Sequence, residues 1–109
     1  MATEITPQQR GTLLTMLEYN LEMIFDYMDA EAKAQKETQL GYFIDSAIMF
    51  IEREGITPNY DNADDLMLIT LYASYLYDKR MDGVSIMPRA LRYNLNNRVL
   101  QEKVNADEA

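Results

Sequence analysis

The sequence predicts an all-α protein, a compact bundle of about four helices without a substantial sheet. Apolar residues recur every three or four positions in separate segments, which is the helical period. The breaks between these segments carry glycine, proline and capping residues, and no useful stretch alternates with a period of two. The 109 residues contain no recognisable linker, so we expect one domain over 1–109, with 1–6 and 105–109 frayed.

The first half of the chain predicts two helices. Thr6 and Pro7 are typical of a helix start. The first helix is therefore expected from about Pro7 to about Met28, with a stripe formed by Leu14, Leu17, Leu21, Ile24 and Met28. Residues 29–38 are either a loop or a weakly anchored beginning of the second helix. From there the stripe is the clearest in the chain, formed by Leu40, Phe43, Ile44, Ala47, Ile48 and Ile51, and Gly55 is expected to end it as a left-handed cap.

The second half predicts two more helices. The third is expected from about Ala63 to about Met81, with Asn62 or Asp61 as its cap and Gly83 after its end. It is apolar on almost every side, which indicates burial on more than one face. Pro88 is expected to open the fourth helix. Its single narrow stripe is Leu91, Leu95 and Val99, and Arg89, Arg92 and Arg98 lie off that stripe.

Charge is unevenly distributed along the chain. The net charge is −8, yet residues 79–103 hold 6 basic and 2 acidic side chains, whereas residues 1–78 hold 4 basic and 14 acidic ones. An acidic body with a basic end suits head-to-tail self-association. A solvated surface with a local bias is the alternative interpretation. The 8 tyrosines and 8 methionines likewise fit either an interface or ordinary packing.

Residue types argue against catalysis and against a bound cofactor. The chain has no cysteine and no histidine, so it lacks the commonest nucleophile–base pairs and transition-metal ligands. Asp61 to Asp65 does not fit a calcium loop, because Leu66 and Tyr72 stand where that loop needs Gly and Glu. We therefore predict no enzyme, no metal and no cofactor. We also expect no signal peptide, because Met1 to Arg10 is polar. We expect no membrane association, since the longest apolar run, Leu66 to Tyr77, is too short to span a bilayer.

One segment resembles a known family. It runs from Asp64-Asp65-Leu66 through Leu76-Tyr77-Asp78-Lys79-Arg80 to Met87-Pro88, Leu91, Leu95 and Arg98. This pattern resembles the head-tail connector (adaptor) proteins of long-tailed, lambdoid-type bacteriophages, which are also filed as possible DNA-packaging proteins. The helix from Leu40 to Gly55 is similar to the family's second helix. The resemblance covers residues 40–100, while residues 7–38 look longer and more acidic than the family's first helix.

The resemblance implies a structural subunit that forms a homo-oligomeric ring below the portal of a phage or prophage. Such a ring would continue the DNA channel without sequence-specific binding and would dock tail or stopper proteins. The protein would then belong to the virion head-tail junction, and to the host cytoplasm during assembly. The candidate subunit or portal interface comprises Tyr75, Lys79, Arg80, Arg89, Arg92 and Arg98.

Two alternatives fit the same residues. The chain could be a small acidic helical phage protein that binds a host protein, or one that binds packaging DNA through the fourth helix. For Arg80, a pairing with Asp78 or Asp82 within the chain competes with a subunit contact.

Overall fold

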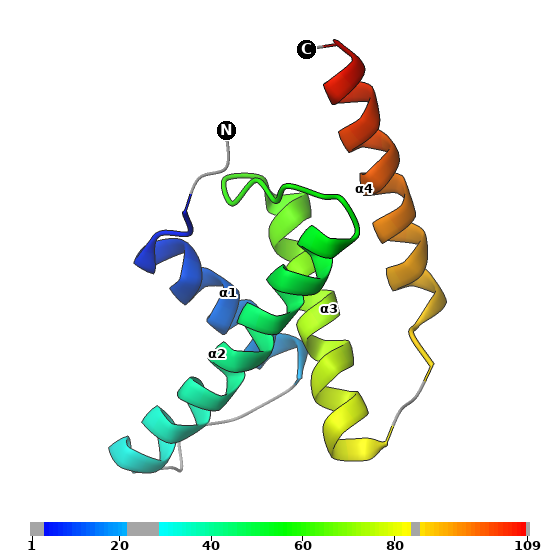
Figure 1. The fold of residues 1–109 in the computed structure, drawn as a ribbon. Coiled ribbons are helices and arrows are strands. Elements are labelled where there is room, and N and C mark those ends of the chain that lie inside the picture. Colours follow the sequence, from blue (N-terminus) through cyan, green and yellow to red (C-terminus); the bar gives the residue numbers. More distant parts are fainter. Residues whose placement is uncertain (1–3, 22–28, 84–85, 109) are drawn as a thin grey trace.

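The computed structural model describes residues 4–21, 29–83 and 86–108 (Figure 1). Within these residues it contains four helices and no strand, which confirms the predicted all-α bundle. The helices are α1 (Pro7–Asn20), α2 (Ala30–Arg53), α3 (Ala63–Asp82) and α4 (Arg89–Glu108).

Side-chain caps fix the starts of the first three helices. Thr6 and Gln9 form a reciprocal capping box at α1, as the Thr6-Pro7 start predicts. Asp29 caps α2 by accepting a 2.7 Å hydrogen bond from the backbone N–H of Ala32. Residues 30–38 are consequently the first turns of α2, not a loop. Of the two proposed caps of α3, Asn62 is the one used, and it accepts from the N–H of Asp64.

Two glycines end helices as predicted. Gly55 has φ 97° and Gly83 has φ 72°, a left-handed conformation that disfavours every residue with a Cβ. Ile56, which follows the first of them, is buried and supplies the hydrophobic contact expected after such a cap.

Two predicted boundaries differ from the structure. Helix α1 ends at Asn20, earlier than the expected Met28, because asparagine is a poor helix former and its side chain is bonded to Ser74 of α3. The rest of that prediction falls on 22–28, outside the described residues. Residues 105–108, expected to fray, belong to α4, since Lys103 to Glu108 contains no glycine or proline to interrupt it. Thr6 is likewise anchored as a cap, whereas residues 1–3 and 109, also expected to fray, lie outside the described residues.

The core lies between α1, α2 and α3, and α4 covers one side of α3. The buried apolar residues are Leu13, Leu17, Leu40, Ile44, Ala47, Ile51, Ile56, Tyr60, Leu68, Ile69, Tyr72, Ala73, Leu91 and Leu95. Leu13 is buried deeper than the predicted Leu14. Tyr72 stacks on Phe50 and Tyr77 meets Phe43 edge-on, so both tyrosines pack against α2. Ser74 bonds to Asn20 of α1 and Asp65 bonds to Arg98 of α4, so α3 does bury different sides against different neighbours.

Helix α4 gives the molecule its elongated outline. Figure 1 shows it running beside α3 in the opposite direction, with its last turns extending past the α2–α3 loop. The radius of gyration is 14.7 Å, above the roughly 13 Å typical of this length. In the described part of the chain, no helix is long and apolar enough to cross a membrane.

Candidate functional site

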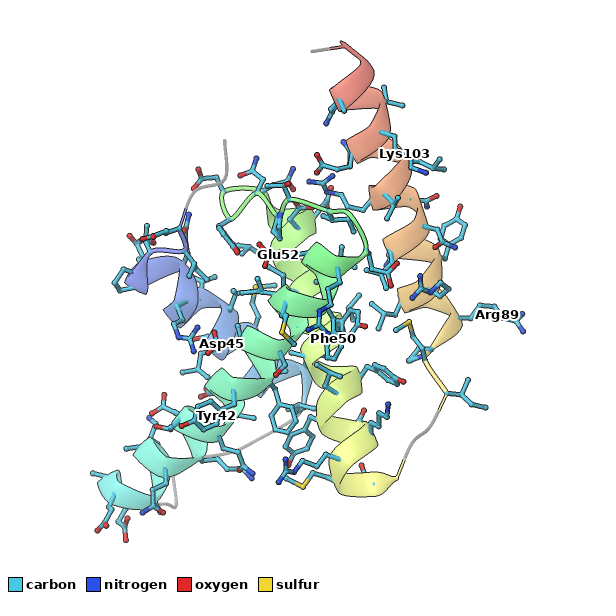
Figure 2. All side chains as sticks on the ribbon, in the orientation of Figure 1. Tyr42, Asp45, Phe50, Glu52, Arg89 and Lys103 are labelled. Carbon is cyan, nitrogen blue, oxygen red and sulfur yellow. The ribbon has the colours of Figure 1, made fainter. Side chains whose placement is uncertain are left out.

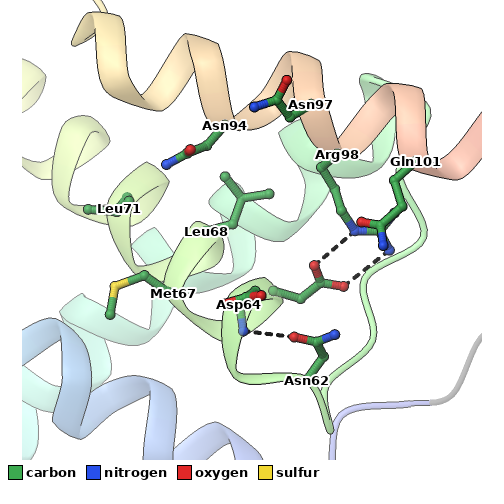
Figure 3. Close-up of a pocket in the computed structure, with 10 residues that line it drawn as sticks. Asn62, Asp64, Met67, Leu68, Leu71, Asn94, Asn97, Arg98 and Gln101 are labelled. Atoms are coloured by element: carbon green, nitrogen blue, oxygen red, sulfur yellow. Dashed lines mark hydrogen bonds and ion pairs between the residues drawn. The ribbon is translucent and has the colours of Figure 1, made fainter.

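Arg98 of α4 is the most deeply held of the candidate interface residues. Its side chain is 14% exposed, and the carboxylate of Asp65, which it meets, is 6% exposed. The guanidinium donates to Asp65 through Nε at 2.8 Å and Nη2 at 3.1 Å (Figure 3). It also donates to Thr57 O at 3.0 Å. Asp65 also accepts from the N–H of Asn59. The hydrogen bond to Asp65 raises the pKa of Arg98 above its ordinary value.

Arg98 therefore joins α4 to the start of α3 and to the α2–α3 loop. Glu102, one turn further along α4, accepts from Arg98 at 3.0 Å and from the N–H of Thr57 at 3.1 Å. This arrangement is bidentate and almost enclosed, a geometry in which charged hydrogen bonds are strong. It fixes the angle at which α4 leaves the body.

Arg92 makes a second, more exposed connection. It donates to Glu54 at the end of α2 through two bonds of 3.1 and 3.0 Å. These bonds lower the pKa of Glu54 below its ordinary value. The arginine side chain is 41% exposed and the glutamate side chain 28%, so water screens this pair more than the Arg98 pair.

The other cations lie on the surface. Arg89, the first residue of α4, points away from the body (Figure 2). Lys79 and Arg80 are exposed in the last turn of α3, and neither forms an ion pair with another described residue. The alternative pairing of Arg80 with Asp78 or Asp82 is thus not seen. Tyr75 is half-buried against Tyr72, with ring centroids 6.1 Å apart.

The six predicted interface residues consequently fall into two groups. Arg92 and Arg98 hold α4 to its own chain, whereas Lys79, Arg80 and Arg89 are available at the surface and Tyr75 is available in part. The sequence could not separate these groups, because all the arginines of the fourth helix lie off its first apolar stripe. Their partners, Glu54 and Asp65, are distant in sequence.

Sequence reasoning missed a second apolar stripe on α4. Tyr93, Leu100 and Val104 are each more than half exposed. At 3.6 residues per turn they fall within about 40° of one another, and Leu100 lies about half a turn from Leu91. The spacings of seven and four residues were visible in the sequence. Only the stripe that covers the core, formed by Leu91, Leu95 and Val99, was predicted from the sequence.

A polar groove separates α3 from α4 on the side shown in Figure 3. Helix α4 contributes the amides Asn94, Asn97 and Gln101, and α3 contributes Met67 and Leu71. The carboxylates of Asp64 and Asp65 also line the groove, and Asp65 is bonded to Arg98. The mixture of amide, charged and aliphatic side chains suits the binding of another protein surface.

Candidate catalytic and metal-binding groups are engaged in structural roles. Ser74 donates to Thr70 O at 2.9 Å and accepts from Asn20. The acidic cluster after Asn59 acts in capping, as predicted: Asn62 and Asp65 accept backbone N–H groups there. Over residues 4–21, 29–83 and 86–108 no group of three potential metal ligands occurs.

Searches among models of protein families, curated proteins and solved structures found no match to this chain.

Proposed function

We propose that this chain is a structural assembly subunit, specifically a head-tail connector that forms a ring below a phage portal. The observation that carries the assembly role is the second apolar stripe of α4. A chain that has completed its own core still presents Tyr93, Leu100 and Val104 to solvent on a rigidly held helix. Exposed apolar surface of this kind marks protein contacts.

The charge distribution supports self-association in a head-to-tail sense. Lys79 and Arg80 are exposed in the last turn of α3 and Arg89 is exposed at the first residue of α4, while residues 1–78 are acidic overall. Complementary patches at different places on one subunit produce heterologous contacts, and these close into rings when the rotation permits.

The phage assignment rests on the resemblance of residues 40–100 to the connector family. On this proposal the ring continues the DNA channel, binds the portal on one side and receives tail or stopper proteins on the other. An acidic channel wall suits passage of DNA, because lysine and arginine along the wall would retain the phosphates. No substrate, cofactor or membrane enters this role.

Direct DNA binding by α4 is disfavoured by the geometry. Arg92 and Arg98 are neutralised by Glu54 and Asp65 of the same chain, so they are not free to pair with phosphates. The chain should therefore leave the mobility of duplex DNA unchanged at low salt. Retardation that fell steeply with added salt would favour the packaging-DNA alternative.

Electron microscopy of negatively stained particles tests the proposal. The concentrated protein, alone or incubated with its cognate portal protein, should give rings of one size with a central opening. Charge reversal by Arg80→Glu with Arg89→Glu should remove them, because both residues are exposed. Lys33→Glu with Arg53→Glu, an equal charge change on the surface of α2, is the control. Particles without rings in both preparations of the unaltered protein would contradict the proposal.

A further inference from the structure

The outer face of α4 is an apolar stripe with basic residues at its border. Arg89 and Lys103 are exposed and lie on the same outward side of the helix as Leu100. They are fourteen residues apart in sequence, which places them about 21 Å apart along the helix.

Helix α3 presents a face with the complementary pattern. Met67 is 48% exposed, and it lines both the groove toward α4 and a second groove toward α1. Leu71, one turn further, is half-buried on the same face (Figure 3). Asp64 and Asp78 lie on this face as well, and they too are fourteen residues apart. Neither aspartate pairs with another described cation.

These two faces match in one register when the helices run antiparallel. Placing Lys103 opposite Asp64 puts Arg89 opposite Asp78, because both separations are the same. Leu100 then lies opposite Met67, since each is three residues from the charged pair at that end. In the same register the small residue Ala63 lies level with Val104 along the helix axis.

The direction of this contact also suits a ring. Within one chain α4 already runs antiparallel to α3 (Figure 1). A neighbour's α4 that lies antiparallel on α3 therefore runs in the same direction as the chain's own α4. Copies related by rotation about an axis parallel to their helices keep this direction, and repetition of one such contact closes a ring.

We propose that the outer face of α4 (Arg89, Tyr93, Leu100, Lys103 and Val104) docks antiparallel on the α3 face (Asp64, Met67, Leu71 and Asp78) of a second copy. The proposal deepens the proposed function, on which it rests, by naming both sides of the subunit contact. The contact is heterologous, so each copy gives one face and receives the other.

Cysteine cross-linking tests this register directly, because the chain contains no cysteine. Full-length Leu100→Cys and Met67→Cys variants are mixed and oxidised mildly with diamide. The mixed disulfide should exceed by at least tenfold the product formed with Met49→Cys, a methionine of similar exposure (40%) on α2. Equal yields with Met49→Cys, or no cross-link, would overturn the proposal. A dominant Leu100→Cys homodimer would also overturn it, because that product indicates a symmetric α4–α4 contact.

A charge exchange gives an independent result. Arg89→Glu with Lys103→Glu should abolish self-association, and so should Asp64→Lys with Asp78→Lys. An equimolar mixture of the two double variants should associate again, because each contact between unlike copies regains opposite charges. Sedimentation velocity measures self-association of each double variant and of the mixture, and circular dichroism verifies that each variant is folded. If the unaltered chain forms a large oligomer that ignores these changes, this contact is wrong while the proposed function stands. If neither the parent nor any variant associates, alone or with portal protein, both fail.

Discussion

Removing the Arg98 guanidinium should destabilise the protein more than any other surface-accessible charge change. The Arg98→Met substitution keeps an apolar chain of similar length but leaves the carboxylate of Asp65, 6% exposed, without its cation. Breaking a buried pair from one side costs about 3–5 kcal/mol. Asp65 retains the N–H of Asn59, so we expect the lower end, about 3 kcal/mol. That is a large part of the roughly 5–15 kcal/mol available to such a domain.

Urea unfolding followed by circular dichroism at the helix band measures this cost, because a domain of this size usually unfolds in one cooperative step. Arg92→Met is the matched control. It removes the same group from a pair that is 41% and 28% exposed, so it should cost less than about 1 kcal/mol. Adding Asp65→Asn to Arg98→Met should recover part of the loss, since the unpaired charge disappears. If Arg98→Met costs no more than Arg92→Met, the assignment of Arg98 as the main attachment of α4 is wrong.

Three further predictions concern backbone and charge. Gly83→Ala should lower the free energy of unfolding by about 1 kcal/mol, since φ is 72°. Gly11→Ala should raise it by about 0.5–1 kcal/mol, because Gly11 lies in a helix with nothing within 4 Å of the added Cβ. Urea titrations measure both changes, and changes of the same sign would contradict the prediction. Arg92 lowers the pKa of Glu54, so the stability that this pair contributes is present above the ordinary glutamate pKa and is lost as pH falls through the lower pKa of the folded state. Glu54→Gln should therefore lower the free energy of unfolding at pH 7 and leave it unchanged at pH 2. A loss that does not depend on pH would contradict a stabilising role of the pair. Burial raises the pKa of Glu18, so its ionised form opposes folding above that pKa, and Glu18→Gln should raise the melting temperature at pH 7 but not at pH 3; a loss at pH 7 would refute this.

The sequence predicted the fold well where residues close together in the chain decide the structure. The Thr6-Pro7 start, the Leu40-to-Ile51 stripe and the glycine ends are decided by nearby residues, and each is present in the structure. The end of α1 was misjudged because it depends on Asn20 meeting Ser74, more than fifty residues away. Helix α4 continues beyond Asn105, where fraying was expected, because no glycine or proline interrupts it there.

The candidate site was harder to predict than the fold. An arginine that lies off an apolar stripe is expected to be exposed. Arg98 is instead mostly buried and paired with Asp65, because α4 packs against α3. No local spacing encodes that meeting. The second stripe of α4 is encoded locally. It becomes interpretable only once the structure shows that Leu91 and Leu95 already cover the core and that Leu100 and Val104 do not.

The mass of the assembly in solution tests the central claim most directly. Sedimentation equilibrium over a wide concentration range, with and without the cognate portal protein, would give that mass. The connector account predicts one large, discrete oligomer whose mass, after subtraction of any bound portal protein, is a whole multiple of 12.7 kDa. A chain that stays monomeric at every concentration, and also in the presence of portal protein, would contradict it.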